Sequence, residues 1–236
     1  MAGSVADRVI DRVLEPEAMD TAEEAREYDL MDHTTVNARF VTDVLEATAR
    51  LGRRRDLRRR FVVDVGTGTA RIPIEFCRVQ PASRVVAVDL AREMLRVARE
   101  NVLSAGLTTR VVLQLARATA LPFRDACSPV VVSNSLIHHL PDPRRAFVEL
   151  ARIVSRGGIL FVRDLVRPDS PAVIDQLVNT YAASATAHQR QLLADSLRAA
   201  LTLDEVRDAI RGLPFAQVSL TATSDRHWTL AAVRAA

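Results

Sequence analysis

Lysine is absent from this chain of 236 residues, and cysteine and tryptophan are scarce. The two cysteines, Cys77 and Cys127, lie in unrelated contexts, which excludes a disulfide framework and a paired-thiol zinc motif. No apolar stretch approaches the roughly 20 residues that a membrane span requires, and the N-terminus lacks the apolar core of a secretory signal. We therefore expect a cytoplasmic protein without a membrane segment.

Because arginine supplies all 32 basic residues, the sequence pI is about 9.4 although the net charge is only +3. A high pI of this origin is weak evidence for a nucleic-acid partner. The one pronounced charge run, RRRDLRRR at 53–60, has two interpretations: an RNA or anionic-substrate patch, or a solvated linker ahead of the first strand. No aromatic residue interleaves with these arginines, which favours the linker.

Short β-branched segments alternate with helical ones through the middle of the chain. The expected strands are 61–65, 84–90, 110–115, 129–135 and 159–165. Each is nearly continuous in apolar character, as in a parallel sheet that is covered on both faces. The expected helices are about 69–79, 91–105 before Gly106, and 143–155 before Gly157 and Gly158. Glycines at these places suit left-handed helix ends, and Asp142 before Pro143 suits a helix start.

This alternation predicts right-handed βαβ crossovers and an open, doubly wound α/β sheet. A helical segment from Thr21, with Glu24 at capping-box spacing, precedes the sheet. A helical region at about 171–199 and a helix from Thr202, with Glu205 at the same spacing, follow it.

Two further strands, 217–223 and 227–233, end the chain, and only three residues separate them. They should therefore pair antiparallel. We expect residues 1–236 to form a single domain. Its parts would be an N-terminal helical cap (1–59), a cofactor-binding core (60–165), and a helical insertion plus a C-terminal β-hairpin (166–236).

The first strand runs into a glycine-rich turn, VDVGTGTA at 63–70. Open α/β sheets bind ligands outside the carboxyl ends of their strands, and Gly66 and Gly68 allow close backbone approach. Asp89 ends the second strand at the spacing from which a carboxylate accepts hydrogen bonds from ribose hydroxyls. Arg71 stands where a dinucleotide fingerprint needs glycine or alanine, and the ending of a P-loop is missing. An adenosine cofactor without a pyrophosphate therefore fits better.

The sequence resembles the class I S-adenosylmethionine-dependent methyltransferases, most of all the small-molecule branch that carries paired histidines after the fourth strand. The resemblance covers roughly residues 60–165 through VDVGTGTA, AVDL, ALPF, SNSLIHHL and SRGGILFVRD. It implies a Rossmann-like sheet of seven mostly parallel strands, the last one antiparallel, and S-adenosylmethionine as the cofactor.

The same resemblance implies a set of cofactor contacts. The residues that it places around the cofactor are Asp64, Gly66, Thr67, Gly68, Thr69, Asp89, Leu90, Met94, Arg117, Ala118, Asn134 and Ser135. The turn residues would surround the amino-acid part and the sulfonium, Asp89 would hold the ribose, and Leu90 and Met94 would flank the adenine. Asn134 and Ser135 would form the wall that faces the methyl group.

Two positions depart from the family's pattern. Arg117 stands where the family usually has an acidic residue that accepts the adenine amino group, and an arginine has no acceptor to offer. That contact must be lost or replaced by backbone, and leaving the buried amino group unpaired would cost on the order of 1–3 kcal/mol, or about tenfold to a hundredfold in affinity. Ser128-Pro129 replaces Phe-Asp at the start of the fourth strand, where proline is tolerated at a strand's first residue or edge.

Methyl transfer needs an aligned nucleophile, and a base only if the acceptor must lose a proton. The candidates for a base or substrate contact, His138, His139 and Asp164, follow the fourth and fifth strands. Helix capping by a histidine and surface pairing of Asp164 with a neighbouring arginine are the alternatives. No metal is expected, because no cysteine or carboxylate lies at ligand spacing from the histidines. The candidate acceptor-pocket residues are Tyr28, Met31, His33, Asn37, Tyr181 and His188.

The sequence thus predicts an enzyme that transfers a methyl group from S-adenosylmethionine to a small-molecule acceptor. The alternative is a non-catalytic protein that binds this cofactor or its demethylated product, or a scaffold with a degenerate pocket; Arg117 and Pro129 motivate it. A third interpretation is an RNA methyltransferase that uses the arginine run.

Overall fold

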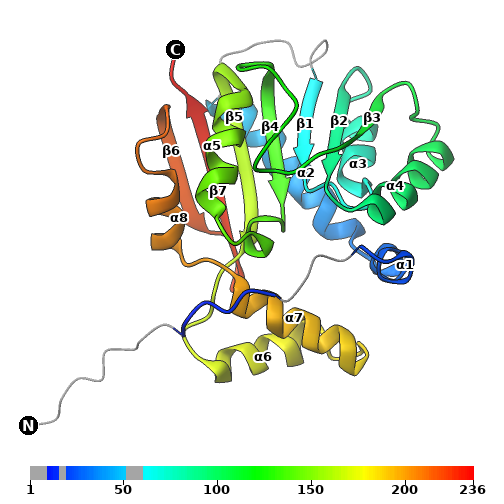
Figure 1. Ribbon diagram of the computed structural model, residues 1–236, viewed down its shortest axis with the longest axis vertical. Coiled ribbons are helices and arrows are strands. Elements are labelled where there is room, and N and C mark those ends of the chain that lie inside the picture. Colours follow the sequence, from blue (N-terminus) through cyan, green and yellow to red (C-terminus); the bar gives the residue numbers. More distant parts are fainter. Residues whose placement is uncertain (1–9, 16–19, 52–60) are drawn as a thin grey trace, which may run out of the picture.

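A computed structural model describes residues 10–15, 20–51 and 61–236 of the chain. A central sheet carries helices on both faces, and two further helices lie beyond one end of the strands (Figure 1). The arginine run at 53–60, predicted to be a linker, lies outside the described residues. Among the described helices, none combines the length and the apolar character that crossing a membrane requires.

Within the described residues, seven strands form one sheet in the order β3-β2-β1-β4-β5-β7-β6. Their bounds are Phe61–Val65 (β1), Arg84–Asp89 (β2), Val111–Leu115 (β3), Ser128–Asn134 (β4), Val154–Leu165 (β5), Phe215–Ala222 (β6) and His227–Arg234 (β7). Strands β1 to β5 pair in parallel, whereas β7 runs antiparallel to both β5 and β6. The predicted doubly wound sheet with an antiparallel last strand is confirmed.

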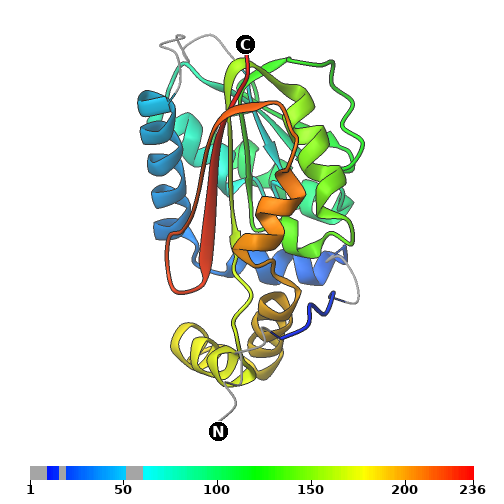
Figure 2. The same ribbon diagram turned by 90° about the vertical axis from the view of Figure 1, so that its left-hand side faces the viewer.

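The helices fall into groups by the part of the sheet that they cover. Their bounds are Ala22–Leu30 (α1), Thr34–Leu51 (α2), Arg71–Val79 (α3), Arg92–Ser104 (α4), Ile137–His139 (η2, a 3₁₀ turn), Pro143–Ile153 (α5), Pro171–Tyr181 (α6), Ala187–Ala199 (α7) and Leu203–Ile210 (α8). Helix α2 lies on one face, and α5 and α8 lie on the other (Figure 2). Helices α1, α6 and α7 lie near the carboxyl ends of the parallel strands (Figure 1).

Apolar side chains pack on both faces of the sheet. This packing holds the strands that carry the site in place. Phe40 of α2 packs edge-on against Phe161 of β5, with ring centroids 5.4 Å apart, in the core on one face. Trp228 of β7 is fully buried in the core on the other face. A smaller cluster joins α6 to α7. Burial of such side chains contributes roughly 1.5–3 kcal/mol each.

The predicted capping boxes are present, but two helical regions are divided. Thr21 and Glu24 cap α1, and Thr202 and Glu205 cap α8, each pair through reciprocal bonds. The N-terminal segment forms two helices rather than one, and the region 171–199 forms α6 and α7. A third capping box, at Thr186, starts α7, and that local start signal explains the break.

The prediction that Gly157 and Gly158 end a helix was wrong. Helix α5 ends at Ile153, and both glycines lie inside β5. Gly157 has φ 67°, and a Cβ on Gly158 would lie 2.8 Å from the Pro129 carbonyl oxygen. The register between β4 and β5 shifts at this place, between Ser128 and Val130. The glycines therefore let β5 pass close to the irregular start of β4.

Pro129 is the second residue of β4 rather than its first, and β4 is an interior strand. The irregular register accommodates it, because a proline has no N–H to offer the ladder. The hydroxyl of Ser128 donates to the Phe61 carbonyl oxygen at 2.7 Å and ties the start of β4 to β1.

Candidate functional site

The glycine turn after β1 is bound directly to the end of β2. Gly66 has φ 78° and Gly68 has φ 54°, both in the left-handed region. The N–H groups of Gly66 and Thr67 each donate to the Val88 carbonyl oxygen at 2.9 Å. The N–H of Gly68 donates to Asp89 Oδ2 at 2.7 Å. The turn and Asp89 are therefore neighbours, as the spacing in the sequence predicted.

Asp64 lies beneath this turn with one carboxylate oxygen unused. Its side chain is 1% exposed, and the Thr67 hydroxyl donates to Oδ2 at 2.6 Å. Asp64 Oδ1 and Thr69 Oγ1 are buried and have no hydrogen-bond partner among the described residues. Burial raises the pKa of Asp64 to about 7; the nearby Asp89 charge adds to this effect and the Thr67 bond opposes it. A ligand that brings a cationic group to this position would satisfy the free oxygen.

Helix α1 covers the turn and is clamped there. A Cβ on Gly68 would lie 3.5 Å from Tyr28 Cε1, so the tyrosine ring lies over this glycine. Arg71 donates to both oxygens of Asp29, at 2.9 and 2.6 Å, and Asn101 Nδ2 donates to Asp29 Oδ1 at 2.8 Å. Burial and the nearby Asp89, Asp64 and Asp29 charges raise the pKa of Tyr28. Arg71, whose presence argued against a dinucleotide site, therefore holds α1 over the glycine turn.

The residues expected around an adenine differ in how far they are exposed to solvent. Leu90 leaves 46% of its surface exposed, whereas Ala118 is buried. Met94 is buried in a small cluster with Ala25 of α1. Arg117 is exposed on the surface. Contact of these four positions with a cofactor stays a prediction.

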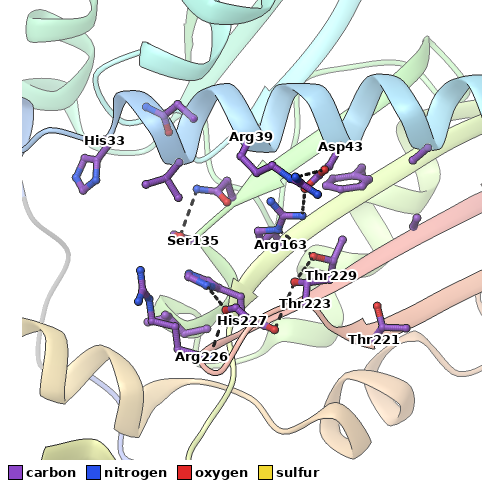
Figure 3. A pocket seen from close by; sticks show the side chains of 18 of the residues that line it. His33, Arg39, Asp43, Ser135, Arg163, Thr221, Thr223, Arg226, His227 and Thr229 are labelled. Atoms are coloured by element: carbon purple, nitrogen blue, oxygen red, sulfur yellow. Dashed lines mark hydrogen bonds and ion pairs between the residues drawn. The ribbon is translucent and has the colours of Figure 1, made fainter. Parts of the chain in front are cut away.

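A cleft of about 1150 Å³ opens beside the turn, between α2 and the strands β5, β7 and β6 (Figure 3). Asn134 and Ser135, at the carboxyl end of β4, form part of its wall. The acceptor-pocket candidates that also line it are Tyr28, His33, Asn37 and Tyr181. Met31 lines a smaller neighbouring cavity of about 260 Å³, and His188 is exposed on α7. The cleft thus brings together four of the six candidates.

The cleft has a charged centre that the sequence reasoning missed. Arg163 of β5 pairs with Asp43 of α2 at 2.7 Å and donates to Thr229 Oγ1 of β7 at 2.9 Å (Figure 3). Its guanidinium lies 5.7 Å from the ring centroids of Phe40 and Phe161. These contacts hold the arginine rigid in the cleft.

His227 is the second missed residue, and it lines the cleft, as Ser135 does (Figure 3). Its Nδ1 lies 3.0 Å from the Ser224 hydroxyl oxygen. Burial, together with the Arg226 and Arg163 charges, lowers the pKa of His227 to about 4. The imidazole is therefore uncharged at neutral pH. One feature of the sequence could have located His227. The first residue of an antiparallel β7 must lie at the carboxyl end of β5, and His227 pairs there with Leu165.

His138 and Asp164 form a buried pair next to the cleft. His138 Nδ1 lies 2.5 Å from Asp164 Oδ1, and Asp164 also accepts the N–H groups of Ile137 and Leu165. Although burial opposes it, the contact with His138 holds the pKa of Asp164 below its ordinary value. The proposed surface pairing of Asp164 with an arginine was wrong, since the carboxylate is buried and faces His138.

Neither His138 nor Asp164 is among the residues that line the cleft, and neither is His139. His139 instead approaches Glu15 of the N-terminal segment, residues 10–15, with His139 Nδ1 2.5 Å from Glu15 Oε2. Sequence spacing missed this carboxylate, because Glu15 comes from far upstream in the chain. A catalytic role for His138, His139 or Asp164 stays a prediction.

Comparison with known proteins adds independent evidence. Residues 63–162 match the family model of a methyltransferase domain. Demethylmenaquinone methyltransferase of Porphyromonas gingivalis is 32% identical over 110 residues, which are 46% of this chain and 45% of that protein. The ubiquinone/menaquinone biosynthesis C-methyltransferase UbiE of Hahella chejuensis is 30% identical over 134 residues, which are 56% and 53% of the two chains. The chain spans about half the length of the curated relatives it matches.

A similar fold occurs in the crystal structure of a SAM-dependent methyltransferase from Aquifex aeolicus. It aligns with a TM-score of 0.64 and 17% identity, over 91% of this chain and 98% of the other. At that identity the likeness shows the fold alone. The family match covers the glycine turn, Asp89 and the paired histidines, on a sheet of the expected strand order. Residues 63–162 therefore match a methyltransferase domain, and the fold around them agrees with the class I S-adenosylmethionine-dependent methyltransferases that the sequence resembles.

Proposed function

We propose that this protein transfers the methyl group of S-adenosylmethionine to a small-molecule acceptor bound in the cleft. One observation carries the proposal: Tyr28 covers the glycine turn and also lines the cleft. A cofactor held at the turn and an acceptor held in the cleft would therefore meet beside one side chain. Such proximity is the main requirement of a direct displacement.

The residues at the turn suit the cationic end of this cofactor. Asp64 offers a buried carboxylate oxygen without a partner, close to the left-handed backbone at Gly68. Each oxygen of Asp89 accepts one backbone N–H, from Gly68 and from Ala91, and keeps a lone pair for a ribose hydroxyl. When bound, the cofactor supplies a methyl group on a sulfonium. The role of the chain is to orient the cofactor and exclude water.

The cleft supplies the acceptor side. Ser135 and His227 both line the cleft (Figure 3). An uncharged imidazole accepts a hydrogen bond from an acceptor hydroxyl or amine and so orients it. We propose this role for His227. The relatives include a demethylmenaquinone methyltransferase, which agrees with a small organic acceptor.

Calorimetry tests cofactor binding first. We expect wild-type protein to bind S-adenosylmethionine and its demethylated product, and Asp89→Asn to weaken both at least about tenfold, because two charge-assisted hydrogen bonds are lost. Asp175→Asn, at an exposed site on α6, is the matched control and should bind like the wild type. Arg117→Asp should tighten binding by restoring an acceptor for the adenine amino group. Absence of binding at millimolar ligand would reject the proposal.

A second experiment separates catalysis from binding alone. Protein is incubated with S-adenosylmethionine labelled in its methyl group and with a cell extract divided into small-molecule and RNA fractions. We expect label in small molecules with wild-type protein, and much less with His227→Gln at unchanged cofactor affinity. Label in RNA would instead support the RNA methyltransferase. Cofactor binding without label in either fraction would support a non-catalytic binding protein, which Arg117 motivates.

A further inference from the structure

Three side chains with metal-binding atoms meet outside the cleft. Glu15 of the N-terminal segment and His138 and His139 of η2 each place one ligand-capable atom within 4.8 Å of the others. The side chains are 13%, 4% and 28% exposed, respectively. A two-histidine, one-carboxylate cluster that is largely shielded from water differs from an ordinary exposed acidic patch.

Glu15 and His139 already face each other inside this cluster. Nδ1 of His139 is buried and lies 2.5 Å from Glu15 Oε2. The two atoms are close enough to share one cation. A bound cation would replace this contact with two metal–ligand bonds.

Asp164 holds the second ring, that of His138, in a fixed position. Asp164 accepts backbone N–H groups from Ile137 and Leu165, so it faces His138 as a carboxylate acceptor. Nδ1 of His138 therefore carries the hydrogen in the 2.5 Å contact with Asp164 Oδ1. In the uncharged imidazole this leaves Nε2 as the lone-pair atom. A carboxylate behind a histidine in this way is the usual outer partner of a zinc-bound imidazole.

The remaining partners fix both halves of the cluster. The Ser196 hydroxyl donates to Glu15 Oε1, which leaves Oε2 for other contacts. Arg12 donates to the carbonyl oxygens of His138 and Leu140, each at 3.0 Å, and so ties the N-terminal segment to η2. Glu15 and Asp164 together outweigh the positive charge of Arg12, so a divalent cation would be favoured electrostatically.

The ligand types select the ion. Magnesium and calcium prefer sites made of oxygen, whereas imidazole nitrogen suits zinc. Two histidines and one glutamate form an established three-ligand set for zinc, with the fourth position open to water. Tetrahedral ligands at about 2.0–2.2 Å from zinc lie roughly 3.4 Å apart. Binding would therefore lengthen the distance between Glu15 Oε2 and His139 Nδ1 from 2.5 Å by about 1 Å.

We propose that Glu15, His138 and His139 bind one zinc ion, which joins the N-terminal segment to the turn after β4. The ion would tie these two segments together beside the cofactor-binding end of the sheet, with its fourth position open to water. The inference stands on this cluster alone and does not depend on the proposed methyl transfer.

The test uses the full-length, untagged protein after removal of metal with a chelator. Cobalt(II) is titrated and followed by visible absorption, and zinc retained after dialysis is counted by elemental mass spectrometry. The variants are Glu15→Gln and His139→Gln. The matched controls are Glu23→Gln on α1 and His188→Gln on α7, two exposed positions. Circular dichroism verifies that each variant folds.

We expect about one zinc per chain and a tetrahedral cobalt spectrum for the wild type and both controls. Each site variant should lose at least about tenfold in affinity. Zinc should also raise the Tm of the wild type, with a smaller rise for Glu15→Gln. Less than about one-tenth of a zinc per chain in the wild type would overturn the proposal. Unchanged affinity in a folded Glu15→Gln protein would overturn it as well.

Discussion

The buried carboxyl of Asp64 makes the stability of the ligand-free protein depend on pH in an unusual direction. Its pKa is raised from an ordinary value of 3.8 to about 7, chiefly by burial. A group whose pKa is higher in the folded state stabilises the fold while it is protonated in both states, below pH 3.8. This contribution is lost as the pH rises through about 7.

The size of the effect follows from the two pKa values. At 1.36 kcal/mol per pH unit, a rise from 3.8 to about 7 corresponds to roughly 4 kcal/mol at pH values above both. About 2.5 kcal/mol of this is lost between pH 5 and pH 8, because the unfolded carboxyl is largely ionised at pH 5. Paired carboxylates such as Asp29 and Asp164, whose pKa values are lowered, titrate in the opposite direction, so only a difference between variants isolates Asp64.

Asp64→Asn removes the titration and keeps the shape of the side chain. Urea denaturation gives the free energy of unfolding of wild type and variant at pH 5 and pH 8. Any constant offset from the contacts of the amide cancels between the two pH values. We expect the free energy of unfolding of Asp64→Asn, relative to that of the wild type, to rise by about 2.5 kcal/mol from pH 5 to pH 8. For the exposed Asp175→Asn control, the same difference should hardly change. A difference between Asp64→Asn and wild type that does not change with pH would refute this reasoning.

Three further predictions follow from the site. Gly66→Ala should lower the free energy of unfolding by at least about 1–2 kcal/mol in urea, because φ is 78° and the new Cβ would lie 2.8 Å from Leu136 Cβ; an unchanged midpoint would contradict this. Arg71→Ala should cost under about 1 kcal/mol of stability, since the pair with Asp29 is partly exposed, yet weaken cofactor binding severalfold in calorimetry. Equal cofactor affinity would show that α1 needs no clamp. Because the pKa of His227 is about 4, this histidine does not titrate between pH 5.5 and 8. The pH profiles of kcat/KM over that range should therefore have the same shape in the wild type and in His227→Gln. An inflection near 6.5 that vanishes in the variant would mean that the histidine titrates normally.

The sheet was predictable from the sequence because its signals are local. The apolar run at Phe61–Val65 was placed correctly to the residue, and the remaining strands were found with boundaries shifted by a few residues. Side-chain caps such as Thr21 with Glu24 also act within one turn of the chain. Gly157 and Gly158 were misassigned because a glycine at a helix end and a glycine in a strand irregularity look alike in sequence.

The candidate cofactor site was predictable where its residues come from neighbouring segments of the sequence. The neighbourhood of the glycine turn and Asp89 follows from parallel pairing of β1 with β2. The clamp of Arg71 on Asp29 and the approach of Glu15 to His139 join distant segments, and no local spacing encodes them. His227 was missed because an expected strand start does not reveal which side chain faces a cleft.

A crystal structure of the protein grown with the demethylated cofactor tests the central claim most directly. We expect the ribose hydroxyls on the Asp89 carboxylate, the ammonium group near Asp64, and the sulfur facing the cleft at Asn134 and Ser135. Cofactor density at another surface, or a ligand whose sulfur points away from the cleft, would contradict the proposed site and with it the proposed methyl transfer.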